Sequence, residues 1–78
     1  MMNNYTEEDL RKYLDEWKKE QEYASEHMHE PNFSWYWHDK ELISIQGAIR
    51  AVYEHLDPNS LTDAENAQVK KILECVID

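Results

Sequence analysis

This chain contains few of the residues that form turns and covalent cross-links. Its 78 residues include one glycine, two prolines and one cysteine. A single cysteine cannot form an intrachain disulfide, so the sequence gives no indication of an oxidising compartment. The scarcity of glycine and proline is atypical of a turn-rich all-β protein, and a hydrophobic content of 41% is too high for a disordered chain. These absences favour a folded helical protein.

Positive charge is also scarce. Eight Lys and Arg stand against seventeen Asp and Glu, which gives a formal net charge of −9. This balance argues against direct binding to nucleic-acid phosphates and against a polybasic membrane-surface segment. The uncharged stretch 42–49 is far shorter than the roughly 20 apolar residues of a membrane span. The first nine residues are acidic, unlike a signal peptide. We therefore expect a cytoplasmic protein without membrane contact.

The first predicted helix spans residues 6–29. Thr6 and Asp9 form a variant capping box, in which each side chain accepts from the backbone N–H of the other residue. Apolar and small residues then recur at spacings of four and three, which is typical of an amphipathic helix. This seam comprises Leu10, Leu14, Trp17, Gln21, Ala24 and Met28. Pro31 disfavours helical geometry at Glu30 and should end the helix.

The second predicted helix spans residues 34–56, from an N-cap at Ser34 to the stop at Asp57-Pro58. Its seam continues at spacings of three and four through Trp35, His38, Leu42, Ile45, Ile49, Val52 and Leu56. A second stripe of small residues comprises Ser44, Gly47, Ala48 and Ala51. Such a stripe allows close helix approach, so we expect helix 63–77 to pack on it, with a second copy of the protein as the alternative occupant. Gly47→Leu should then destabilise the fold.

The third predicted helix spans residues 63–77 and opens with a capping box of Thr62 and Glu65. Short connections between the three helices predict an up-down-up three-helix bundle that forms a single helical domain over residues 1–78. The end of the third helix should then pack near Phe33 and Trp37. Because so short a chain buries little surface, self-association into a dimer is an open alternative.

The sequence contains none of the common catalytic or cofactor-binding patterns, such as a Gly-rich phosphate loop or a His-Glu-x-x-His motif. Cys75 has acidic neighbours at a helix C-terminus, where a reactive thiolate is disfavoured. We therefore expect neither an enzyme nor a cofactor. Glu26 with His29, and His38 with Glu41, have spacings seen in metal-binding bundles. A Glu/His metal-binding bundle is therefore a further alternative, although we assign no metal ligands.

Acidic residues accumulate in the second half of helix 6–29. Glu16 and Glu20 form a like-charged pair four residues apart, as do Glu22 and Glu26, and then Glu26 and Glu30. Each pair is repulsive by about 0.2–0.5 kcal/mol, and the last residues also face the negative end of the helix dipole. No Lys or Arg occurs between Lys19 and Lys40. Uncompensated repulsion of this kind favours a partner that supplies cations.

Aromatic residues cluster beside this acidic segment, at Phe33, Trp35, Tyr36 and Trp37. Successive helical residues point about 100° apart, so one core cannot bury all of them. We expect Tyr36 to stay at least half exposed, and Tyr36 and Trp37 to anchor a partner.

The sequence therefore predicts a non-enzymatic protein–protein interaction module. It would bind a larger protein through that protein's basic surface, and would inhibit it where the surface is a nucleic-acid-binding groove. The predicted partner-binding residues are Glu16, Glu20, Glu22, Glu26, Glu30, Tyr36 and Trp37. A self-associating structural protein is the main alternative.

Overall fold

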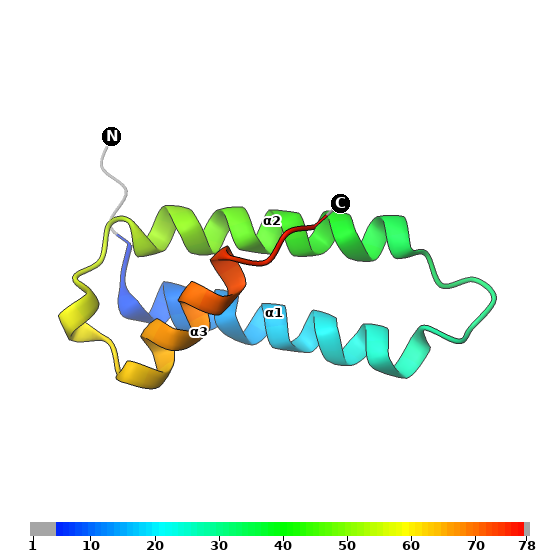
Figure 1. Cartoon of the computed structure of the whole chain (residues 1–78), viewed down its shortest axis with the longest axis horizontal. Helices are drawn as coiled ribbons and strands as arrows, with labels where there is room; N and C mark the ends of the chain where they lie inside the picture. The colour runs from blue at the N-terminus through cyan, green and yellow to red at the C-terminus, as the bar shows by residue number, and fades with distance from the viewer. Residues whose placement is uncertain (1–4, 78) are drawn as a thin grey trace.

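The computed structural model describes residues 5–77, and this part of the chain is all-α. It consists of α1 (Glu7–His27), α2 (Trp35–Tyr53), the 3-10 turn η1 (Pro58–Ser60) and α3 (Asp63–Leu73). α1 and α2 form a long antiparallel hairpin, and α3 crosses one end of it (Figure 1). The predicted three-helix bundle is confirmed. No helix in residues 5–77 is both long and apolar enough to span a membrane.

All three predicted helix starts are confirmed. The Thr6 hydroxyl accepts from the backbone N–H of Asp9 at 3.3 Å, and the Asp9 carboxylate accepts from the N–H of Thr6 at 3.0 Å. Thr62 and Glu65 form the same reciprocal pair at 3.1 and 2.9 Å. Ser34 accepts from the N–H of Trp37. Each helix therefore begins where a side chain satisfies an N–H that lacks a partner within the helix.

All three helices end earlier than predicted, and α3 by the most. The predicted helix continues to residue 77, whereas α3 ends at Leu73. The side-chain amide of Gln46 donates to the backbone carbonyls of Ile72 and Cys75, at 2.7 and 2.9 Å. The Ile72 carbonyl also accepts from the backbone N–H of Cys75 at 3.1 Å, a bond that closes the last turn of α3. Gln46 thus connects the end of α3 to α2, and residues 75–77 continue along α2 without helical structure (Figure 1).

The two long seams meet in a common core together with one side of α3. Leu10, Ile49, Val52 and Val69 are completely or almost completely buried. The rest of the core cluster is Leu14, Trp17, Leu42, Ile45, Leu61 and Ile72. Burial of a side chain of this size contributes about 1.5–3 kcal/mol. The core therefore concentrates at the end of the hairpin that α3 crosses.

The opposite end of the hairpin lies beyond the reach of α3. An 11-residue helix is about 16 Å long, whereas the 19 residues of α2 extend over about 28 Å. The expectation that the third helix would end near Phe33 and Trp37 is therefore wrong. Trp37 is 67% exposed and Trp35, predicted to belong to the buried seam, is 51% exposed.

The small-residue stripe of α2 is not occupied by α3 at its central position. Gly47 is exposed, and a Cβ atom added there would meet no atom within 4 Å. Ser44 is exposed as well, while Ala48 and Ala51 are half-buried. The expectation of close packing on Gly47 is therefore wrong, because α3 crosses α2 on a neighbouring face.

An ion pair connects α1 to the beginning of α3. Nε of Arg11 donates to Oε2 of Glu65 at 2.7 Å, while Glu65 also caps α3. The hydrogen bond from Arg11 and then the one from the Thr62 backbone lower the pKa of Glu65 to about 2. One carboxylate therefore both starts α3 and orients it against α1.

Substitution of Gly47 tests the open space on α2. Gly47→Ala should raise the free energy of unfolding by about 0.5–1 kcal/mol, since alanine removes the entropic cost of a helical glycine and meets no neighbour. Gly47→Leu should also be tolerated. Urea unfolding of the three proteins measures this. A loss of about 1 kcal/mol or more in Gly47→Leu would show that a side chain packs there after all.

The Glu65 ion pair predicts a specific response to acid. The folded pKa lies below the unfolded value of 4.5, so the contribution of Glu65 is complete above pH 4.5 and is lost as the pH falls towards 2. The melting temperature of the wild type should fall as the pH is lowered across this window, and that of Glu65→Gln should fall less. Glu22→Gln, at an exposed position, serves as the control. Parallel curves for the wild type and Glu65→Gln would contradict the assignment.

Candidate functional site

We define the hairpin tip as residues 20–41: the second half of α1, the connection, and the start of α2. It contains five of the nine Phe, Trp and Tyr residues of the chain, namely Tyr23, Phe33, Trp35, Tyr36 and Trp37. Tyr36 is 60% exposed, which confirms the prediction for this residue. Tyr23, Trp35 and Trp37 are also more than half exposed. The tip therefore presents an aromatic surface that α3 does not cover.

The tip aromatics form two groups. Phe33 lies edge-on to Trp35, with ring centroids 5.0 Å apart, and 6.4 Å from the ring of Tyr23. Trp37 instead packs on Tyr36, at 5.2 Å. A groove of about 320 Å³ is bounded by members of both groups. Its lining comprises Tyr23, Phe33 and Trp37 with Glu20, Asn32, Ser34, His38 and Glu41. We call this the tip groove.

A histidine–carboxylate pair lies at the wall of the tip groove. The ring Nδ1 of His38 lies 2.8 Å from Oε2 of Glu20 and donates to it. The His38 side chain is 5% exposed and that of Glu20 is 21% exposed. The ring also lies edge-on to Trp35 and near Phe33. Glu20 thus satisfies a polar group that would otherwise be buried in an aromatic setting without a partner.

The five predicted glutamates do not share one face. Along a helix, Glu20 and Glu22 point about 160° apart, at about 100° per residue. Glu16 and Glu20 lie on the half-buried flank of α1, whereas Glu22 and Glu26 are exposed. Glu30 lies in the connection, where its Oε1 is 3.0 Å from Nδ1 of His27, at an angle unsuited to a hydrogen bond. The structure therefore groups Glu20 with Trp37 in the tip groove and separates them from the exposed acids.

The hairpin tip is strongly acidic as a whole. It contains six Asp and Glu residues and one basic residue, Lys40, which gives 1 − 6 = −5 with neutral histidines. The Lys40 ammonium lies 5.2 Å from the centre of the Tyr36 ring. Neither Glu22 nor Glu26 forms an ion pair within residues 5–77. More than half of the net charge of the chain is therefore placed around the exposed aromatics.

The histidines of the tip are not arranged as a metal centre. Across the described residues, no group of three or more His, Cys, Asp or Glu side chains could hold a metal ion. His38, one of the residues with a metal-site spacing, is instead bonded to Glu20.

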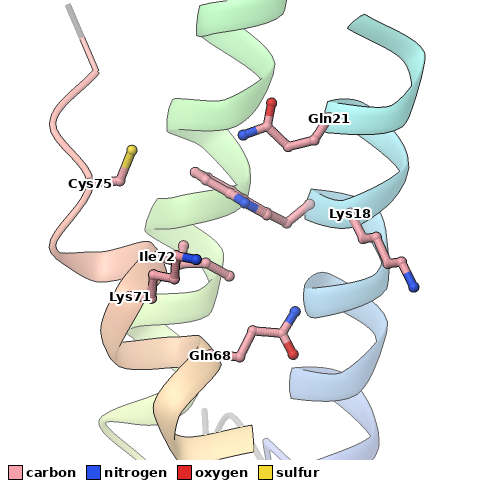
Figure 2. Close-up of a pocket in the computed structure, with 7 residues that line it drawn as sticks. Lys18, Gln21, Gln68, Lys71, Ile72 and Cys75 are labelled. Carbon is pink, nitrogen blue, oxygen red and sulfur yellow. The ribbon is translucent and has the colours of Figure 1, made fainter. Parts of the chain in front are cut away.

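A second groove of about 370 Å³ lies between α1 and α3. Figure 2 shows Gln21 of α1 and Gln68 of α3 pointing into the space between the helices, with Lys18 turned outward. Trp17, Lys71, Ile72 and Cys75 complete its lining. This groove exists because α3 diverges from α1 after the Arg11–Glu65 ion pair. It combines an apolar floor with two lysines at its borders.

Comparison with known proteins identifies no relative: no family model, no curated protein and no solved structure matches this chain.

The pair of His38 and Glu20 predicts that two neighbouring glutamates differ in their effect on stability. Glu20→Ala leaves the buried Nδ1 of His38 without an acceptor and should lower the free energy of unfolding by about 1–2 kcal/mol. Glu22→Ala removes the same charge from an exposed position and should change it by less than about 0.5 kcal/mol. Urea unfolding of both variants measures the difference, and equal effects would refute the structural role of Glu20.

Proposed function

We propose that this protein is a non-enzymatic interaction module whose hairpin tip binds a basic surface of a larger protein. The observation that carries the proposal is the exposure of the aromatic side chains at the tip, beyond the end of α3. Clustered exposed aromatics are typical of protein-binding surfaces, and Trp and Tyr are the residues most enriched among interface hot spots. Tyr36 and Trp37 are the proposed anchors.

The charge of the tip supports a basic partner. Carboxylates around the aromatic surface attract a positively charged protein and accelerate the encounter, while the aromatic side chains contribute most of the affinity. Glu22, Glu26 and Glu30, together with Glu16 on the α1 flank, are the proposed charge contacts. Glu20 contributes indirectly, because its carboxylate is held by His38. A partner whose basic surface normally binds nucleic acid would be inhibited by such an acidic occupant.

The proposal is tested with a partner captured from the native host and then purified. Tyr36→Ala combined with Trp37→Ala should weaken binding by about 30-fold or more, the effect of losing a hot spot. Glu22→Gln combined with Glu26→Gln should slow association and reduce its dependence on salt. Surface plasmon resonance at several salt concentrations measures both effects.

The matched control is Glu54→Gln combined with Glu74→Gln, which makes the same change in net charge at exposed positions outside the tip. It should affect association much less than the tip variant does. Binding that survives the aromatic substitutions, or that responds equally to both pairs of glutamine substitutions, would rule out the tip as the docking surface.

Self-association is a second candidate function, and the groove between α1 and α3 favours it. Trp17 and Ile72 give this groove an apolar floor, and Lys18 and Lys71 lie at its border. The acidic aromatic tip of a second copy is complementary to such a surface. Light scattering across a concentration series distinguishes the two candidates, since self-association through the tip would be lost in the Tyr36 and Trp37 variant.

A further inference from the structure

Three aromatic side chains line the tip groove. Tyr23 and Phe33 lie near each other, with their ring planes inclined by 32°. Trp37 is 67% exposed and packs on Tyr36. Aromatic faces attract cations through the negative charge of the π system. The ammonium of Lys40, 5.2 Å from the centre of the Tyr36 ring, is an example of this attraction within the tip itself.

The carboxylates of the groove differ in availability. Glu20 is 21% exposed, and its carboxylate accepts a hydrogen bond from Nδ1 of His38. Glu41 is exposed and forms no ion pair in the described part of the chain. No Lys or Arg lines the groove. The tip groove therefore offers three aromatic side chains and one unpaired carboxylate, without a cation of its own to neutralise them.

We propose that the tip groove receives an arginine side chain of the partner, with the guanidinium stacked on Trp37 and donating to Glu41. This inference rests on the proposed function and names the group that is recognised. Arginine suits the site better than lysine, because its planar guanidinium stacks on aromatic faces and donates two parallel hydrogen bonds to a carboxylate. The roles differ within the groove: Glu41 binds the cation, whereas Glu20 positions His38.

The inference is tested on the isolated protein, without any partner. N-acetyl-arginine amide and its neutral analogue N-acetyl-citrulline amide are titrated while NMR follows the indole N–H signals of the three tryptophans. The arginine compound should shift the Trp37 signal, and citrulline should bind at least about fivefold more weakly, as expected for loss of a cation–π contact. The lysine analogue should bind more weakly than arginine. The signal of the buried Trp17 serves as an internal control.

Variants locate the binding site. Glu41→Gln should weaken arginine binding about threefold, as expected for loss of an exposed ion pair. Trp37→Leu should abolish binding, which is followed in this variant by the ring proton signals of Tyr23 and Phe33 in the same groove. Glu54→Gln, an equal charge change outside the tip, should leave the affinity unchanged. Trp37 is largely exposed, so its replacement leaves the core intact.

Three results would overturn the inference: equal binding of arginine and citrulline, equal binding of arginine and lysine, or equal effects of Glu41→Gln and Glu54→Gln. None of them bears on the capture experiment. If the partner still requires Tyr36 and Trp37 while arginine is not recognised, the inference is wrong and the proposed function stands. If arginine is recognised but the partner ignores the tip, the proposed function is wrong and the groove remains a cation site.

Discussion

The length of α3 determines what the rest of this molecule exposes. Two long helices form a hairpin, and one helix of 11 residues covers only the end that contains most of the core. α3 ends at Leu73, where Gln46 donates to the carbonyls of Ile72 and Cys75, and the chain continues along α2 without helical structure. The tip aromatics lie beyond the end of α3 and are exposed. The groove between α1 and α3 forms where α3 diverges from α1.

The tip keeps its structure without a third helix because polar and aromatic contacts replace a hydrophobic core there. Ala24 is buried, but the neighbouring contacts are those of rings and of the bond between His38 and Glu20. A hydrogen bond between buried polar groups is directional. This one fixes the register of α1 against α2 where few apolar side chains are buried. Phe33 and Trp37 line the tip groove together with this pair. The same pair thus connects the stability of the tip to the shape of the groove.

Local signals in the sequence predicted the beginnings and inward faces of the helices. Thr6, Ser34 and Thr62 cap their helices as expected, since a capping side chain acts within four residues of its own position. The length of α3 and the extent of the core were harder to predict from the sequence. Val76 and Ile77 continue an apolar pattern, yet α3 ends before them, at a point where the amide of Gln46, nearly thirty residues away in the sequence, contacts the last carbonyls. Trp35 belongs to the apolar seam of α2 but is half exposed, because a seam indicates a buried face only where a neighbouring element covers it.

The candidate site was predicted in composition but not in arrangement. Tyr36 is exposed at the acidic end of the hairpin, as the crowding of aromatic residues indicated. Trp37, which was expected beside the third helix, is exposed as well. Of the like-charged pair Glu16 and Glu20, however, Glu20 has a hydrogen-bond partner within the chain, because it faces His38 across the hairpin. One signal in the sequence pointed to this contact: a histidine in an apolar seam needs a hydrogen-bond partner. Glu22 and Glu26 are exposed on α1 and form no ion pair in the described structure. These two carboxylates and that of Glu41, rather than a continuous acidic face, are therefore the ones that remain available to an external cation.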